Sequence, residues 1–317
     1  MANQRLSKDK RALVLSALCE GTPINAVCRM FKTGKHAVLR VIEETGQALA
    51  NYMSTNFRDL PCTRVEMDEQ WQYVGMHGQR MMKKEAGRGD FWLWCAIDPD
   101  TKLVFSHTIG RRTREFGEMF VEDVAKRVAG PVQIATDNFP QYAFHIRNAF
   151  GYEGYSYGTE TKVFGEPRNW PLNEAQRDRK NGIPQVATAT RKAVVGSPNL
   201  GSLTTSHIER VFLSVRQELT RFTRLTLGYS KDLRMHKLAV SLHFGIYNLV
   251  RKHKTLGTTP AVAAGIEEKR WTLEDVVEMT EKFWQPRYEA AAVAKAAARR
   301  ASEDDAFQKA MAELDSH

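Results

Sequence analysis

The chain lacks the features that would place a protein in or across a membrane. Its 317 residues contain no apolar run of about 18 residues, which a spanning helix requires. The first residues, from Met1 to Arg5, lack the apolar core of a secretory signal. There are only four cysteines, with no CxxC pair and no zinc-ligand spacing: Cys19, Cys28, Cys62 and Cys95. We therefore expect reduced thiols and a cytoplasmic protein.

Acidic charge is scarce in one part of the chain in particular. The whole sequence has 46 Lys and Arg against 37 Asp and Glu, a net charge of +9. Residues 140–260 contain 18 basic and 8 acidic side chains, whereas residues 61–139 contain 11 and 12. A strongly basic region beside a near-neutral one suits a protein that grips a phosphate backbone. A basic surface kept for solubility is the alternative.

Residues 7–49 have the pattern of three short helices. Ser7 can cap the first, and Thr22-Pro23 can open the second. A short second helix, a tight turn and a third helix form the helix-turn-helix layout. The third helix would enter the major groove of double-stranded DNA by its N-terminal end, which offers Lys35, His36 and Arg40. A small helical bundle without a DNA role is the alternative.

The pattern changes to one of strands after a linker over residues 51–63. Period-two, aromatic and β-branched runs predict strands over residues 64–76, 91–97, 103–109 and 132–136. Helices are expected over residues 113–128, 141–150, 203–224 and 233–251. Strands that alternate with helices predict an α/β fold, a mixed sheet with helices on its faces. Residues 151–202, rich in Gly, Asn, Pro and basic residues, are interpreted as a functional insertion or substrate loop.

Three acidic residues stand in settings that suggest a shared site. Asp68 lies on the first predicted strand, Asp137 ends the fourth, and Glu209 lies on the helix over 203–224. If the first and fourth strands are neighbours, the two aspartates lie side by side. Hard divalent cations prefer such carboxylates, and a pair of them supports in-line displacement at phosphorus. Three arginines on the same helix as Glu209 are candidate phosphate contacts: Arg216, Arg221 and Arg224.

Other acids compete for the third position. Asp137 and Glu209 lie 72 positions apart, a gap wide enough to contain alternatives. These lie in loop-like or Gly-flanked sequence: Glu153, Glu160, Glu166 and Glu174. Asp98 competes for an aspartate position, but Asp98-Pro99-Asp100 is typical of a turn.

In these motifs the chain resembles the DDE transposase and integrase superfamily. Within it, the resemblance is to transposases of bacterial insertion sequences of the insertion-sequence-one type. It covers about residues 64–265 and rests on five segments: Met67–Trp71, Leu93–Asp98, Thr136-Asp137, His207–Arg210 and Tyr247–His253. The chain departs from that type in having a plain helix-turn-helix pattern where a Cys-based zinc motif is common.

The resemblance implies a fold, a chemistry and partners. It implies a ribonuclease-H-like core over residues 64–265, to which the sequence pattern adds a helix-turn-helix domain over 1–50 and a helical tail over 266–317. It implies 3′-end cleavage and strand transfer, with two Mg²⁺ ions, or Mn²⁺ in their place, held by Asp68, Asp137 and Glu209. The implied partners are the element's terminal repeats, target DNA and further copies of the chain, in a dimer or larger assembly at the bacterial nucleoid.

Two other functions fit the same residues. One is a domesticated sequence-specific DNA-binding regulator with an idle core. The other is a structure-specific DNA nuclease, which would cut branched DNA regardless of sequence. Metal-dependent cleavage at specific element ends distinguishes the transposase from both.

Overall fold

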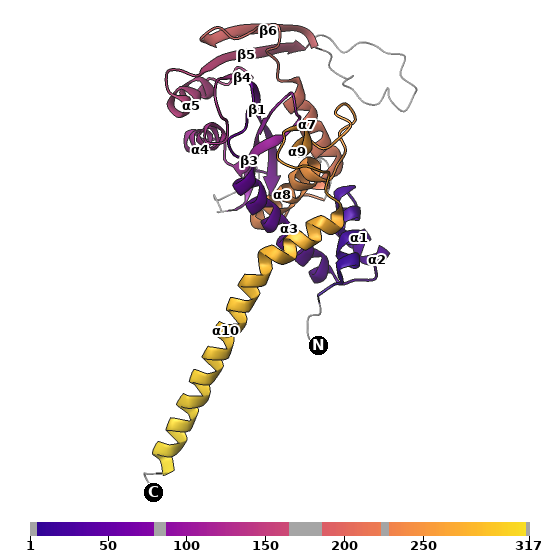
Figure 1. Cartoon of the computed structure of the whole chain (residues 1–317), viewed down its shortest axis with the longest axis vertical. Coiled ribbons are helices and arrows are strands. Elements are labelled where there is room, and N and C mark those ends of the chain that lie inside the picture. Colours follow the sequence, from indigo (N-terminus) through magenta and orange to yellow (C-terminus); the bar gives the residue numbers. More distant parts are fainter. Residues whose placement is uncertain (1–4, 79–86, 165–185, 223–227, 315–317) are drawn as a thin grey trace.

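The computed structural model describes residues 5–78, 87–164, 186–222 and 228–314. Its centre is one mixed sheet of six strands (Figure 1). The strands are β1 (Arg64–Val74), β2 (Gly89–Ile97), β3 (Val104–Gly110), β4 (Val132–Thr136), β5 (Tyr155–Phe164) and β6 (Val186–Val195). Their order across the sheet is β3-β2-β1-β4-β5-β6. The predicted mixed α/β fold and the first four predicted strands are confirmed.

The strand directions place β1 beside β4 at the middle of the sheet. β1 pairs antiparallel with β2 and parallel with β4, with Met67 opposite Thr136. β4 pairs parallel with β5, while β2–β3 and β5–β6 are antiparallel pairs. The neighbourhood of the first and fourth strands is therefore as the site prediction requires. This order of mixed strands is compatible with the ribonuclease-H-like core that the resemblance implies.

Helices cover both faces of the sheet (Figure 1). α4 and α5 lie on one face, and α7, α8 and α9 lie toward the other. The helices after β3 are α4 (Arg114–Ala125), α5 (Gln141–Phe150), α7 (Ser206–Glu218), the short 3-10 helix η2 (Thr220–Phe222), α8 (Leu233–Leu249), α9 (Pro260–Ala263) and α10 (Leu273–Leu314). α10 packs by its first turns and then extends away from the body. None of the described helices is apolar over a length that could cross a membrane.

The three predicted N-terminal helices are present as α1 (Lys8–Cys19), α2 (Ile24–Met30) and α3 (Lys35–Asn56). α3 is longer than predicted and continues through residues 51–56, which the sequence pattern assigned to a linker. Its apolar stripe continues at Leu49 and Met53, which are buried. The backbones of α3 and α8 also approach each other closely. A Cβ added to Gly46 of α3 would lie 2.4 Å from the Leu238 carbonyl oxygen of α8. The helix thus continues because it packs against the core.

The segment over residues 151–202 differs from the expected insertion or loop. Its described part contains β5 and β6, two strands of the central sheet. The strands were not predicted because their sequence is polar and contains glycine. β5 begins Tyr-Ser-Tyr-Gly-Thr-Glu and lacks a regular alternation of apolar residues. Residues 165–185, which include the competitors Glu166 and Glu174, lie outside the described residues.

Candidate active site

The structure places the three predicted acids on the elements that the sequence indicated. Asp68 lies on β1, Asp137 directly follows β4, and Glu209 lies in the first turn of α7. Because Met67 is opposite Thr136 in a parallel pair, Asp68 and Asp137 follow at the same level of the sheet. The two strand-borne acids are therefore neighbours, and the third comes from a helix packed on β1.

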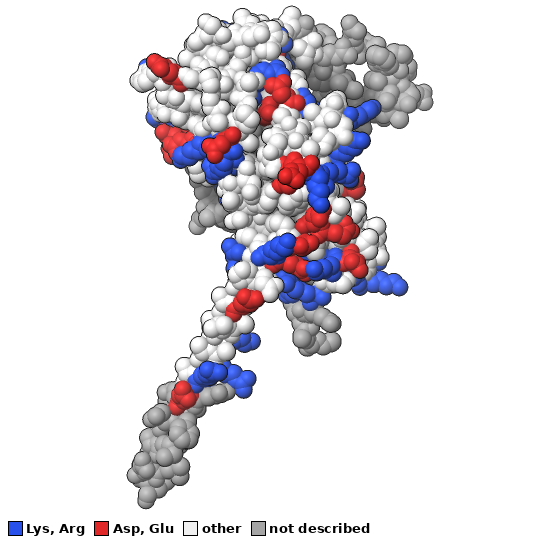
Figure 2. Space-filling view, in the orientation of Figure 1, with Lys and Arg blue, Asp and Glu red and all other residues white. Residues whose placement is uncertain are grey.

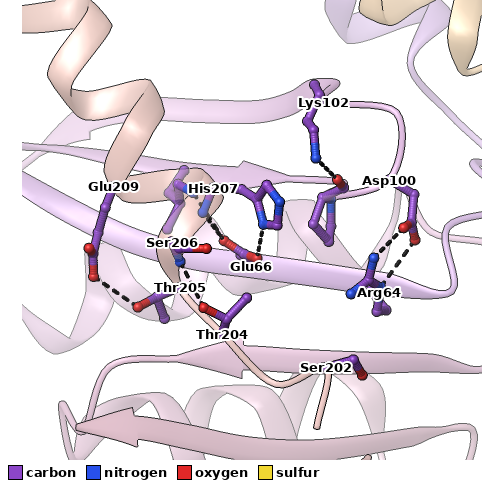
Figure 3. Close-up of polar contacts among 12 residues, drawn as sticks. Arg64, Glu66, Asp100, Lys102, Ser202, Thr204, Thr205, Ser206, His207 and Glu209 are labelled. Carbon is purple, nitrogen blue, oxygen red and sulfur yellow. Dashed lines mark hydrogen bonds and ion pairs between the residues drawn. The ribbon is translucent and has the colours of Figure 1, made fainter. Parts of the chain in front are cut away.

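A buried glutamate that the sequence patterns did not single out fixes α7 on the sheet. Glu66 is 2% exposed and lies two residues before Asp68, so both side chains are on the same face of β1. Its carboxylate accepts hydrogen bonds from the backbone N–H groups of His207 (2.9 Å) and Ile208 (3.0 Å). It also contacts Nδ1 of His207 at 2.7 Å (Figure 3). A carboxylate at a helix N-terminus satisfies free N–H groups and complements the helix dipole.

A second buried glutamate, Glu160 on β5, holds the same end of α7. It is 3% exposed and accepts hydrogen bonds from the Thr205 backbone N–H (3.0 Å) and the Thr204 hydroxyl (3.1 Å). Arg191 on β6 donates to its other oxygen at 3.1 Å. Glu160 was a competitor for the third acid of the site. In the structure it joins β5 and β6 to α7 instead.

The Glu209 carboxylate contacts residues beside the helix terminus. Its Oε1 lies 2.6 Å from Nζ of Lys162 and accepts a hydrogen bond from the Thr205 hydroxyl at 3.0 Å. Figure 3 shows the side chain directed toward Thr205. Glu209 thus lies on a helix, as predicted, and its carboxylate contacts a lysine of β5.

The two aspartates are in an environment that disfavours their charge. Burial raises the pKa of Asp68 well above its ordinary value, and the carboxylates of Glu69, Asp137 and Glu209 raise it further. Burial also raises the pKa of Asp137, and Glu209 adds to this effect against the opposing contribution of Arg112. Like charges brought together at a buried site are a signature of functional sites.

The donor set suits a hard divalent cation, although the ligands are not assembled. Among the residues that the structure describes, no three His, Cys, Asp or Glu side chains are grouped as a metal site. The Glu209 carboxylate contacts Lys162 at 2.6 Å. The chemistry nevertheless fits, since carboxylate oxygens are the preferred ligands of Mg²⁺ and a cation would relieve the repulsion at Asp68 and Asp137.

The competitor Asp98 is a turn residue, as its sequence suggested. Its carboxylate accepts hydrogen bonds from the Asp100 backbone N–H (2.9 Å) and the Thr101 hydroxyl (2.6 Å). This is the side-chain pattern of an Asx turn. Both carboxylate oxygens therefore hold the β2–β3 connection.

The predicted DNA contacts differ in their accessibility. Lys35 and His36 are exposed in the first turn of α3, and Arg40 is half-buried. Arg216, in the last turn of α7, is also half-buried. Arg221 donates to the Ser230 hydroxyl at 3.0 Å, so its guanidinium already has a partner within the chain. Arg224 lies outside the described residues.

Comparisons with known proteins give structural likenesses only. No family model matches the chain, and no curated protein matches it. The chain is similar to a piggyBac transposase in a synaptic complex with hairpin DNA, at 12% identity and a TM-score of 0.37, over 91% of this chain and 76% of that one. It is also similar to the Mos1 transposase in a paired-end complex with the left transposon end, at 11% identity and a TM-score of 0.21, over 50% of this chain and 59% of that one. With TM-scores below 0.5, these likenesses carry no weight for the function of the chain.

Proposed function

We propose that the chain is a DNA transposase of a bacterial insertion sequence, which cleaves the 3′ ends of its element and transfers them to target DNA. The observation that supports this most is the arrangement of Asp68 and Asp137. They lie at one level of two parallel strands, half-buried and close to further carboxylates that raise the pKa of Asp68, beside the helix that contains Glu209. This is the order and placement of acids that the resemblance to DDE enzymes implies.

The chain's own residues have distinct roles in this proposal. Asp68, Asp137 and Glu209 would hold two Mg²⁺ ions, or Mn²⁺. The bound ions would supply activation of the attacking oxygen and stabilisation of the leaving oxygen at phosphorus. Glu66 and Glu160 position α7, and therefore Glu209, relative to the strands.

DNA recognition is assigned to the N-terminal helices and to α7. Lys35, His36 and Arg40 would read the terminal repeats from the first turns of α3, as in a helix-turn-helix reader. Arg216 would contact the phosphate backbone near the site. Joining two element ends requires two copies of the reader, so a dimer or larger assembly is part of the proposal.

The test is cleavage of the DNA that flanks the gene, in Mg²⁺ or Mn²⁺. We expect nicked and joined products from the wild-type protein and none above background from Asp137→Asn. Asp98→Asn, which changes an acid of the turn, should retain cleavage. Equal cleavage by wild type and Asp137→Asn would overturn the assigned site. Specific binding to the ends with no cleavage under any metal would instead favour the DNA-binding regulator.

A further inference from the structure

Lys162 of β5 contacts two acidic side chains, Glu209 of the candidate site and Glu160 of β5. Its Nζ lies 2.6 Å from Oε1 of Glu209 and 3.3 Å from Oε2 of Glu160. The same nitrogen donates to the Thr205 hydroxyl at 3.3 Å. The Lys162 side chain is 13% exposed, whereas the Glu209 side chain is 47% exposed. A nearly buried lysine is thus the cation that contacts the most accessible acid of the candidate site.

The two acids depend on Lys162 to different degrees. Glu160 is also satisfied by Arg191 and by the Thr205 backbone N–H. The contacts of the Glu209 carboxylate within the described residues are Lys162 and the Thr205 hydroxyl. If Glu209 rotates away, Lys162 keeps Glu160 as its partner and is not left as an unpaired buried charge. Release of Glu209 therefore costs only a half-exposed ion pair, which is a weak interaction.

The charge around the aspartates gives Glu209 a reason to stay with Lys162. Asp68 and Asp137 lie at one level of neighbouring strands, so two carboxylates already stand beside the helix that contains Glu209. Closer approach of a third carboxylate would increase this repulsion. Added positive charge at the aspartates would favour the rotation.

We infer that Lys162 is a positioning residue that holds Glu209 away from Asp68 and Asp137 and competes with the divalent cation for its carboxylate. The inference rests on the proposed function, since it concerns the same site. It assigns two positions to Glu209, one on Lys162 and one at the metal. Completion of the ligand set then requires an exchange of one cation for another.

The test is the affinity of the full chain for Mn²⁺ in the absence of DNA, measured by electron paramagnetic resonance of the free ion. Loss of a half-exposed ion pair corresponds to a few-fold change in affinity, so we expect Lys162→Met to bind Mn²⁺ about 3- to 10-fold more tightly. Lys162→Arg keeps the pair and should resemble the wild type.

Two further variants separate competition from a general change in charge. Arg191→Met removes another cation from Glu160 but leaves the Lys162–Glu209 pair, and should bind Mn²⁺ as the wild type does. In a Glu209→Gln background, Lys162→Met should give no gain. Thermal unfolding of each variant establishes that it is folded.

The outcomes distinguish this inference from the proposed function. If the wild type binds Mn²⁺ and cleaves DNA, but Lys162→Met binds no more tightly, Lys162 does not compete and the inference fails alone. Equal tightening in Arg191→Met, or tightening that persists with Glu209→Gln, also overturns it. A wild type that neither binds Mn²⁺ nor cleaves overturns the proposed function and the inference with it.

Discussion

Two regions of the molecule differ in how their charged side chains are paired. Where α10 leaves the body, α1, α3 and α10 meet, and Figure 2 shows basic and acidic side chains interspersed there. Arg11 of α1 is 6% exposed and pairs with Glu281 of α10. Glu44 of α3 pairs with Arg5 at 2.8 Å and accepts a hydrogen bond from the Tyr288 hydroxyl at 2.8 Å. At this corner, Arg11 and Glu44 each form an ion pair within the chain, although Nε of Arg11 has no hydrogen-bond partner among the described residues.

The acid cluster beside α7 is built in the opposite way. Burial and the neighbouring carboxylates of Glu69, Asp137 and Glu209 raise the pKa of Asp68. Burial of like charges costs stability and serves no packing purpose. The corner pairs its buried charges within the chain, whereas the cations of the cluster, Lys162 and Arg112, contact Glu209 and Glu69 and leave the pKa of Asp68 raised. Changes of pH and of single residues can test this difference.

Acid should destabilise the packed region through its buried histidines. Burial lowers the pKa of His107 to about 4 and the pKa of His236 and His243 to about 3, from 6.5. The unfolded chain protonates these groups near pH 6.5 and the folded chain does not. The contribution of these histidines to stability is therefore fully present above pH 6.5 and falls as pH drops toward 4, by up to about 1.4 kcal/mol per pH unit for each.

Urea unfolding at pH 7.0, 6.0 and 5.0 measures this slope. His236→Gln should remove the contribution of one buried histidine, up to about 1.4 kcal/mol per pH unit. His36→Gln, which changes an exposed histidine, is the matched control and should leave the slope unchanged. A pH profile that His236→Gln leaves unchanged would show that this ring is not kept neutral by burial.

Removing one partner of the buried pair at the corner should be strongly destabilising. Arg11→Met removes the buried partner of Glu281, which keeps Lys8, and we expect loss of this charge-assisted hydrogen bond to cost about 2 kcal/mol. Lys8 also pairs with Glu281, at 2.8 Å, but is exposed. Lys8→Met should therefore have little effect in the same urea titration. Equal losses from the two substitutions would mean that burial does not strengthen the Arg11 pair.

The comparison also shows what sequence patterns can and cannot predict. Period-two alternation located β1 to β4, and strand adjacency then placed Asp68 beside Asp137. The same alternation puts Glu66 on the face of Asp68, so a signal for it was present in the sequence. Its contact with His207 was not predictable, because a strand pattern gives the face of a side chain and not its partner across 141 residues.

Two departures have the same physical origin, which is tertiary packing. β5 and β6 were missed because the sheet stabilises strands whose own sequence is polar and rich in glycine. α3 continues past residue 50 because Gly46 and Gly245 let it lie closely against α8. Neither contact can be derived from local propensity, since each depends on a segment far away in the chain.

Neutralising one acid of the cluster should stabilise the protein. Asp68→Asn removes a buried charge from among like charges, and we expect a gain of about 1 kcal/mol at pH 7 without divalent cations. Asp123→Asn is the contrasting variant, because Asp123 pairs with Arg127 and should lose stability. Mg²⁺ should raise the melting temperature of wild type more than that of Asp68→Asn. A destabilised Asp68→Asn would mean that the charge is compensated after all.

Truncation of α10 should have the smallest effect. Every described side chain from residue 285 to 301 is exposed, and the helix leaves the body there (Figure 1). A chain ending at Glu289 keeps the Tyr288 contact with Glu44 and the hydrogen bond from Trp284 Nε1 to the Glu44 carbonyl. Its melting temperature should lie within about 2 °C of the full chain, because no burial is lost. A chain ending at Lys282 loses both contacts and should melt clearly lower. If the first truncation instead lowers the melting temperature by a concentration-dependent amount, the distal helix is covered by another copy of the chain, and the corner is not complete within a single chain.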